Sequence, residues 1–281
     1  MSDSVAPVTR MQYKKHRAQF KNFCDTLHLS AKKSKFVEAL QLWVAELSKQ
    51  GASYGSVLAK LAAVRHHRKK SRKDAKLSSH RLELMLRGLK KRRRTGPGKI
   101  PVTISHMQRL HKAADSMGNS EALRVKAMTT LAFFGFLRPS ELCISRSNHH
   151  LRRQDVRINK TNRYCLIKFN TFKHSEGTQV IKIEEQTHGP IRPVKTIRTY
   201  LNTSNNSSPS GHQPLFDMTV EEFKDKIAEL CQTAGIKSKI TPHCFRVGGA
   251  TWASRQGWPD ARIQQHGRWK SGAYKSYIKP Y

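Results

Sequence analysis

Acidic side chains are scarce in this chain of 281 residues, which has 53 Lys and Arg but only 19 Asp and Glu. The formal net charge of +34 makes a compact fold repel itself, and a polyanionic partner relieves that repulsion. DNA or RNA is the leading partner, because Lys and Arg neutralise phosphates and release condensed counterions. An acidic membrane surface and an RNA scaffold of the ribosomal kind are weaker alternatives.

Long apolar runs are missing too. No stretch reaches the length of a membrane-spanning helix, and the sequence MSD at the start does not open a signal peptide. We therefore expect no membrane partner and no secretion. The basic runs at 65–73 and 90–94 are typical of either a nuclear localisation signal or contacts with phosphate. We therefore expect a nuclear location in a eukaryote and a cytoplasmic one otherwise.

Metal-binding patterns are also absent. The sequence has no Cys-x-x-Cys, and its 14 His residues show no His-x-x-x-His grouping. An odd number of cysteines, scattered in apolar surroundings, indicates small buried residues in a reducing compartment. These cysteines are Cys24, Cys143, Cys165, Cys231 and Cys244. The sequence therefore predicts neither a metal nor another cofactor.

Helical periodicity dominates the first hundred residues. Three apolar stripes of helical spacing follow one another, at residues 36–47, 57–64 and 82–89. Two Pro and two Gly then fall within residues 95–101, which is typical of a linker. We place an all-helical, basic DNA-binding domain at residues 1–97 and a second domain at residues 98–281.

The basic helix ends of the first domain are the predicted DNA contacts. A solvated surface is the alternative, but runs of one sign this long favour a polyanion. The residues concerned are Arg68, Lys69, Lys70, Lys90, Lys91, Arg92 and Arg93.

Beyond the linker the pattern changes from helices to a short sheet and back to helices. A helix at about 121–136 has the apolar composition of a buried spine. Alternating residues between 156 and 183 predict a small antiparallel sheet, with a hairpin turn at 174–177. Thr219 and Glu222 form the pattern of a capping box. The predicted fold class is mainly α with a small antiparallel β-sheet: an all-helical domain followed by a mixed α/β domain.

Residues with recognisable phosphate chemistry lie in four short motifs of this second domain. Arg138 lies in LRPSEL, His243 and Arg246 in HCFR, Trp269 in HGRW and Tyr277 in YIKP. At a helix start, a His and an Arg three positions apart project from one face. Each residue alone has an ordinary explanation, such as a surface Arg or a core aromatic. Their order and intervals, taken together, are much more specific.

This set resembles the catalytic residues of the tyrosine recombinases, the phage integrase family of DNA strand-exchange enzymes. The resemblance covers residues 100–281, whereas the first domain is similar to the family's core-binding (SAM-like) region only in its helical, basic character and in the sequence GLKK. The sequence FRVGGAT is most similar to recombinases of eukaryotic DIRS-like and crypton-like mobile elements. The resemblance implies cleavage and rejoining of double-stranded DNA through a 3′-phosphotyrosine intermediate, without metal or ATP.

The resemblance also implies a role for each residue. Tyr277 would attack the scissile phosphorus, and Arg138 and Arg246 would clamp its non-bridging oxygens, because a planar guanidinium donates two parallel hydrogen bonds. His243 would bind the phosphate or accept the phenol proton. Trp269 would donate its indole N–H to a phosphate oxygen.

Two further residues complete the implied site. Glu141 matches the acidic residue in the family's first arginine motif and would orient Arg138. Lys173, just before the hairpin turn, would protonate the departing 5′-oxygen, as a flexible ammonium can. Lys168 and Lys182 on the neighbouring strands are alternatives to Lys173.

Rivals exist for two of these roles. Tyr274 lies too close to Trp269 for the family's spacing, and Tyr281 is the last residue of the sequence, where chain ends fray. His266 is an alternative to Trp269. These three residues are weaker candidates than Tyr277 and Trp269.

Other functions remain open at this level. A type IB topoisomerase-like enzyme would use the same chemistry as a monomer, and a catalytically impaired DNA-binding protein derived from a mobile element would use none of it. The resemblance implies a tetramer on DNA. Many relatives continue after the tyrosine with a helix that docks into a neighbouring subunit, whereas four residues follow Tyr277 here. Three alternatives stay open here: assembly through another surface, a truncated sequence, or an impaired protein.

Overall fold

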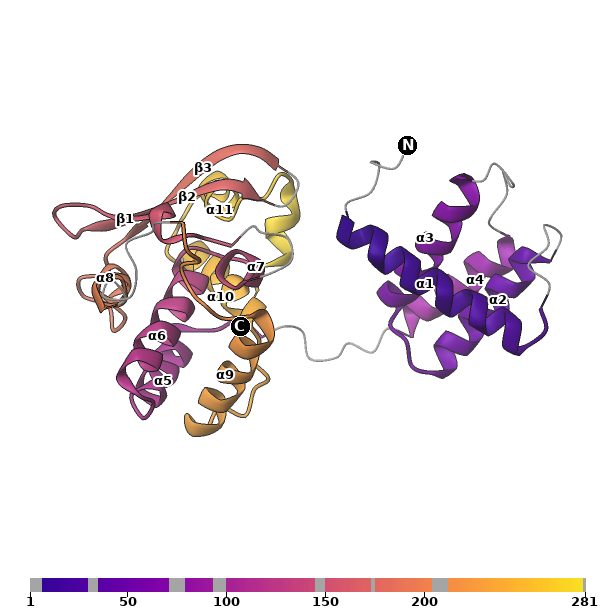
Figure 1. Ribbon diagram of the computed structural model, residues 1–281, viewed down its shortest axis with the longest axis horizontal. Coiled ribbons are helices and arrows are strands. Elements are labelled where there is room, and N and C mark those ends of the chain that lie inside the picture. Colours follow the sequence, from indigo (N-terminus) through magenta and orange to yellow (C-terminus); the bar gives the residue numbers. More distant parts are fainter. Residues whose placement is uncertain are drawn as a thin grey trace. The chain divides into compact units, whose positions relative to one another are not determined.

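The computed structural model describes residues 7–29, 35–70, 79–92, 100–144, 150–172, 175–203 and 212–279. The chain divides into two compact units, Met1–Gly96 and Pro97–Tyr281 (Figure 1). Over the described ranges, none of the helices combines the length and the apolar composition that crossing a membrane requires.

The described part of the first unit consists of helices packed around one core. They are α1 (Pro7–Thr26), α2 (Phe36–Lys49), α3 (Tyr54–Lys70) and α4 (His80–Lys91). The predicted stripe of α2 is buried at Leu40, Trp43 and Leu47, and it packs with Phe20 of α1 and Leu82 of α4. The prediction of a helical first domain is therefore confirmed.

The second unit is built on α6 (Asn119–Phe134), whose residues from Ala127 to Phe134 are all buried. The prediction of a buried spine is confirmed, because α5, α8 and α10 all pack against this helix. The other helical elements are α5 (Ile104–Ala114), α7 (Pro139–Leu142), η1 (Arg153–Asp155), α8 (Pro193–Thr203), α9 (Val220–Thr233), α10 (Pro242–Arg255), α11 (Asp260–His266) and η3 (Gly272–Ser276). At the start of α9 the predicted capping box is present: Thr219 Oγ1 accepts the Glu222 N–H, and the Glu222 carboxylate accepts the Thr219 N–H.

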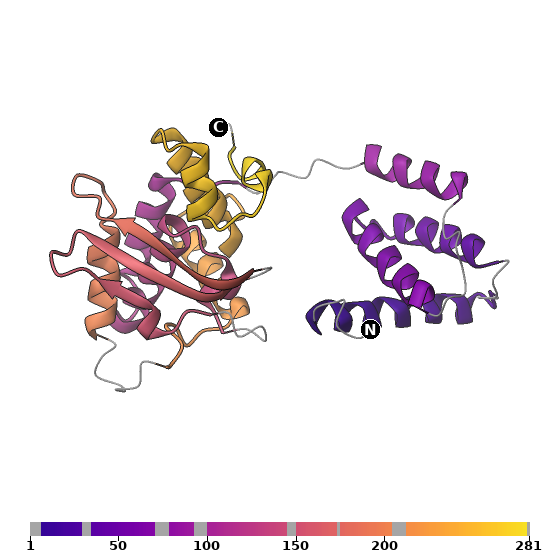
Figure 2. The ribbon, with the colours of Figure 1, turned by 90° about the horizontal axis from the view of Figure 1, so that it is seen from above.

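A three-stranded antiparallel sheet covers one side of the helices (Figure 2). Its strands lie in the order β1 (Val156–Ile158), β2 (Tyr164–Phe172), β3 (Ser175–Glu184). Ile167 in the central strand pairs with Val156 on one side and Ile181 on the other, and all three side chains are buried. The predicted fold class, mainly helical with a small antiparallel sheet, is confirmed.

The predicted hairpin turn at 174–177 is wrong in its position. Phe172 pairs with Ser175 and Thr171 with Glu176, so strand β3 already begins at Ser175. The register then shifts between Phe169 and Thr171. Gly177, at φ +115°, lies opposite this shift, so it serves a bulge within the strand rather than the turn.

The predicted spine helix also ends earlier than expected, at Phe134 instead of residue 136. Gly135 caps the helix, and Phe136 adopts the left-handed conformation with φ +49°. The Leu137 N–H then bonds back to the Ala132 carbonyl at 3.2 Å. This reversal leaves the Phe136 carbonyl without a place in the helix ladder, and buried arginines use it instead.

Candidate active site

The turn after α6 fixes Arg138. Arg138 is the N-cap residue of α7, with Pro139 at the first helical position and Glu141 at the third. Glu141 Oε2 accepts the backbone N–H of Arg138 at 2.7 Å, and Oε1 accepts its Nη1 at 2.8 Å. The Arg138 side chain is 22% exposed and that of Glu141 is 2% exposed. The sequence LRPSEL thus holds one guanidinium at the surface by a buried carboxylate.

Helix α10 lies very close to its neighbours because of two glycines. A Cβ on Gly248 would lie 2.1 Å from the Val102 carbonyl oxygen, and one on Gly249 would lie 2.0 Å from that of Phe133. The helix starts with Thr241 as its N-cap residue and Pro242 at its first position. This close approach brings the side chain of Arg246 up to the turn that follows α6.

Arg246 is completely buried. Its Nη1 donates to the Phe136 carbonyl and its Nη2 to the Gly267 carbonyl, at 2.6 Å for the second bond. The guanidinium carbon lies 4.2 Å from the centre of the Trp269 ring and 5.6 Å from that of Tyr277. Its Nε is also buried, with no hydrogen-bond partner among the described residues. Two aromatic rings therefore cover an arginine that still has an unused donor.

The backbone of Tyr277 is tied to η3 and to α10. Its N–H donates to the Tyr274 carbonyl at 2.8 Å. The hydroxyl of Thr251 lies 3.1 Å from the Tyr277 carbonyl and accepts the N–H of Lys279 at 3.2 Å. A small cluster of buried residues from α10, α11 and η3 supports this segment. The last described residues are thus docked on the helix that carries Arg246.

The ring of Tyr277 lies among the other predicted residues. Its centre is 5.0 Å from the ring of Trp269 and 5.4 Å from that of His243. His243 occupies the second position of α10, near the positive end of the helix dipole, which favours an anion. Three stretches of the sequence therefore converge at one place, with Arg246 beneath the two aromatic rings.

The sequence HGRW forms a tight turn that ends α11. The Trp269 N–H bonds back to the Gln264 carbonyl at 3.0 Å, while Arg268 adopts the left-handed conformation with φ +57°. The ring of Trp269 packs directly over Gly267, since a Cβ on Gly267 would lie 1.7 Å from Trp269 Cζ3. This turn orients the Gly267 carbonyl towards Arg246 and places the Trp269 indole over the Arg246 guanidinium.

Arg268 was missed by the sequence reasoning. Its side chain is fully enclosed, and its Nη2 donates to Glu141 Oε2 at 2.8 Å. It also donates to the carbonyls of Gly135, Phe136 and His266. The only signal in the sequence was the basic residue between Gly267 and Trp269, and its partners lie too far away in the chain to be inferred.

Positive charge exceeds negative charge at this place. Among the described residues, Arg138, Arg246 and Arg268 face a single carboxylate, Glu141, which leaves an excess of two positive charges. Burial, Arg138 and Arg268 lower the pKa of Arg246 to about 9, so its guanidinium stays protonated at pH 7. Burial alone would raise the pKa of Glu141, but the surrounding arginines hold it below its ordinary value. An anion bound here would relieve this excess.

The rivals for the tyrosine and tryptophan roles have structural partners. The hydroxyl of Tyr274 donates to Asp260 at 2.8 Å, and its side chain is buried. His266 Nε2 donates to the Phe134 carbonyl at 2.8 Å, and burial lowers the pKa of His266 to about 4. Tyr274 instead packs against Trp269, with ring centres 6.4 Å apart. Tyr281 lies outside the described residues.

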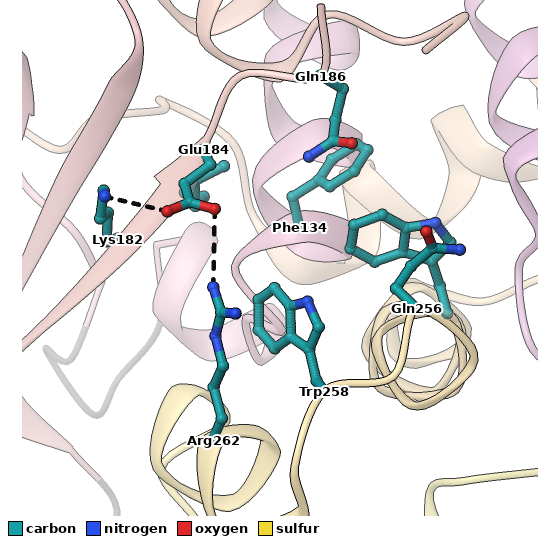
Figure 3. A pocket seen from close by; sticks show the side chains of 9 residues that line it. Phe134, Lys182, Glu184, Gln186, Gln256, Trp258 and Arg262 are labelled. Atoms are coloured by element: carbon teal, nitrogen blue, oxygen red, sulfur yellow. Dashed lines mark ion pairs between the residues drawn. The ribbon is translucent and has the colours of Figure 1, made fainter. Parts of the chain in front are cut away.

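Lys173 also lies outside the described residues, so its predicted role is not located. Its alternative Lys182 lines a separate cleft between β3 and the α10–α11 connection. Figure 3 shows the Glu184 carboxylate between Lys182, at 3.0 Å, and Arg262, at 3.7 Å. Lys182 is therefore engaged on the sheet surface, and Lys168, on the same sheet, is exposed.

The predicted DNA contacts of the first unit lie at helix ends. Arg68, Lys69 and Lys70 end α3, whereas Lys90, Lys91 and Arg92 are exposed at the end of α4. Arg93 lies outside the described residues.

A comparison with protein families identifies one family. The sequence profile of the phage integrase family matches residues 102–277, so the predicted resemblance is confirmed. No curated protein sequence gives a significant match to the chain. The DIRS-like or crypton-like subgroup stays a prediction.

Solved structures with a similar fold include three DNA recombinases or integrases. XerA recombinase has a TM-score of 0.51 at 20% identity, over 100% of this chain and 90% of that chain. A Tn1549 transposon integrase in complex with a circular intermediate DNA has a TM-score of 0.71 at 12% identity, over 99% of this chain and 91% of that chain. A lambda integrase dimer bound to a COC′ core site has a TM-score of 0.65 at 12% identity, over 99% of this chain and 73% of that chain. At these identities the likeness shows the fold.

Proposed function

Because the chain belongs to the phage integrase family, we propose that it is a site-specific DNA recombinase that breaks and rejoins DNA through Tyr277. The observation that carries this proposal is the convergence of Arg246, His243, Trp269 and Tyr277 beside a surface arginine, Arg138. Similar folds in DNA complexes, such as the Tn1549 integrase, support double-stranded DNA as the substrate.

The proposed reaction exchanges one phosphodiester for another. The phenolic oxygen of Tyr277 bonds to the scissile phosphorus as the bond to the 5′-oxygen breaks, which leaves a 3′-phosphotyrosine and a 5′-hydroxyl. His243, whose ring centre is 5.4 Å from that of Tyr277, accepts the phenol proton. Lys173 supplies a proton to the departing oxygen. The number of phosphodiester-type bonds is conserved, so no energy source is needed.

Guanidinium groups stabilise the extra negative charge of the five-coordinate phosphorus. Arg138 is the accessible member of the set, at 22% exposure, so a DNA phosphate meets it first. Arg246 is covered by the rings of Trp269 and Tyr277. Direct contact between Arg246 and a phosphate therefore requires at least one of these two rings to move aside.

Assembly and location are part of the same proposal. Strand exchange between two DNA sites needs four active sites, so we propose a tetramer on DNA, acting in the nucleus if the source is a eukaryote. A monomer that relaxes supercoils without joining two sites would instead be a topoisomerase of type IB.

A nicked suicide duplex tests covalent attack, because loss of a short 5′ fragment prevents rejoining. A pool containing randomised sequences, together with the DNA that flanks the gene, avoids assuming the target site. We expect the wild-type protein and Tyr274→Phe to form a protein–DNA adduct that survives denaturation, and Tyr277→Phe to form none. An adduct that persists in Tyr277→Phe, or its absence with the wild-type protein, would overturn the proposal.

A further inference from the structure

Arg268 contacts the supports of both predicted phosphate-binding arginines. It shares Glu141 with Arg138: Glu141 Oε1 accepts Arg138 Nη1, while Oε2 accepts Arg268 Nη2, each at 2.8 Å. It shares the Phe136 carbonyl with Arg246, since Arg268 Nη2 lies 3.2 Å from that oxygen. One side chain therefore links the acceptors that set the positions of Arg138 and Arg246.

Arg268 itself does not reach a substrate. Its side chain is 0% exposed, and its guanidinium is surrounded by protein groups. One of these is the ring of Phe169 on β2, whose centre lies 4.2 Å from the guanidinium carbon. Any influence of Arg268 on the reaction is therefore exerted through its neighbours.

The backbone at Arg268 also points to a specific requirement. The residue has φ +57°, a left-handed conformation that glycine adopts at the end of α9 (Gly235, φ +62°). A side chain in this conformation is disfavoured and persists only where its surroundings hold it. Here four hydrogen bonds from one guanidinium hold it.

Sharing a carboxylate changes the charge that Arg138 presents. With Arg138 alone, Glu141 would neutralise the guanidinium that faces solvent. With Arg268 as a second partner, the carboxylate is neutralised from within the protein, so Arg138 retains attraction for an anion. The arrangement orients Arg138 without cancelling its charge.

We propose that Arg268 is a positioning residue for strand exchange, which holds Glu141 and the Phe136 carbonyl so that Arg138 and Arg246 act on the same phosphate. This inference rests on the proposed function. It assigns to HGRW a second task besides supplying Trp269.

The test compares Arg268→Met and Arg268→Lys with the matched control Arg262→Met. Arg262 lies on α11, is half exposed and pairs with Glu184 in the separate cleft. Single-turnover cleavage of a suicide duplex that the wild-type protein cleaves is measured together with DNA affinity and the thermal midpoint. We expect Arg268→Met to cleave about 10- to 100-fold more slowly, with DNA affinity within about twofold, as for lost positioning of reacting groups. Arg262→Met should cleave at the wild-type rate.

A pH profile separates positioning from a merely structural role. The charged groups facing Glu141 are Arg138 from the α6–α7 turn, Arg246 from α10 and Arg268 after α11. Removing Arg268 raises the pKa of Glu141, so the carboxylate becomes protonated, and Arg138 loses its orienting partner, as the pH falls. The cleavage defect of Arg268→Met should therefore grow as the pH falls, relative to the wild-type protein. In a Glu141→Gln background the added effect of Arg268→Met should be smaller and independent of pH.

Each outcome has a defined meaning. A wild-type rate in folded Arg268→Met, or a defect that parallels the wild-type pH profile, overturns this inference and leaves the proposed function intact. If Arg268→Met does not fold, Arg268→Lys decides: a lysine keeps the charge but not the fork of hydrogen bonds, so an unchanged cleavage rate overturns the inference. Absence of any adduct with the wild-type protein overturns the proposed function instead.

Discussion

At the scale of single residues, Gly267 determines where the ring of Trp269 lies. The missing Cβ leaves room for the indole, which in turn covers the guanidinium of Arg246. The Gly267 carbonyl also accepts Arg246 Nη2. An alanine at position 267 should therefore disturb both the Trp269 ring and the Gly267 carbonyl, which are the two groups that contact the buried Arg246.

We predict that Gly267→Ala lowers the free energy of unfolding by about 1–3 kcal/mol, as overpacking of a filled site does, and slows cleavage at least about tenfold. Gly272→Ala is the matched control, because a Cβ there would meet nothing within 4 Å. Urea unfolding and single-turnover cleavage measure the two effects. Equal free energies of unfolding and equal cleavage rates in the two variants would show that the position of the Trp269 indole does not depend on Gly267.

Local pairs were predictable from the sequence, whereas distant ones were not. The capping box of Thr219 and Glu222 spans three positions and depends on residue type alone. The pair of Arg138 and Glu141 spans the same distance. Arg268 bonds to Glu141 across 127 positions, and no local rule indicates such a partner. The functional residues were therefore named from family motifs, while their support became visible only in the fold.

At the scale of elements, the distance between α10 and α6 decides whether Arg246 reaches the turn after α6. Gly249 allows this distance, because its Cα faces the carbonyl of Phe133 directly. That carbonyl is backbone and cannot move away as a flexible side chain can.

We predict that Gly249→Ala lowers the free energy of unfolding of the second unit by more than about 2 kcal/mol, because a buried helix pair must separate.

Gly88→Ala in α4 is the opposite case. A Cβ there meets nothing within 4 Å, so the alanine should stabilise the first unit by about 0.5–1 kcal/mol through helix propensity. Thermal or urea unfolding measures both, and destabilisation by Gly88→Ala with a neutral Gly249→Ala would contradict the packing described.

Two element boundaries differed from the sequence expectation for physical reasons. Apolar composition continues through Phe136, so periodicity alone extended the spine helix to that residue. The left-handed conformation of Phe136, stabilised by Arg246 and Arg268 at its carbonyl, ends the helix earlier. In the hairpin, Gly177 suggested a turn, but a glycine in a bulge has the same sequence signature.

At the scale of the whole molecule, the net charge of +34 should govern binding to DNA. We predict that DNA affinity falls steeply with salt, and that replacing Lys90, Lys91 and Arg92 together by Gln makes the slope of log K against log salt shallower by about 2–3 units, because each phosphate contact contributes about 0.9. Fluorescence anisotropy over a series of salt concentrations measures the slope. An unchanged slope would mean that the exposed end of α4 does not contact phosphate.

Acid should destabilise the second unit through two buried histidines. Burial lowers the pKa of His111, which contacts Thr129, and of His266 to about 4 each. Their folded pKa lies below the unfolded value near 6.5, so their contribution is complete above about pH 6.5 and is lost as pH falls towards about 4, at a maximum of about 3 kcal/mol each. Urea unfolding at several pH values tests this. His111→Gln should flatten the dependence within that window, and an equally steep dependence in this variant would exclude His111 as its source.

The most direct measurement is a crystal structure of the covalent complex trapped on a suicide duplex. It should show phosphorus bonded to the Tyr277 oxygen, with nitrogen atoms of both Arg138 and Arg246 about 3 Å from its non-bridging oxygens. A phosphate bonded to another residue, or one that either guanidinium fails to reach, would contradict the convergence on which the proposed function depends.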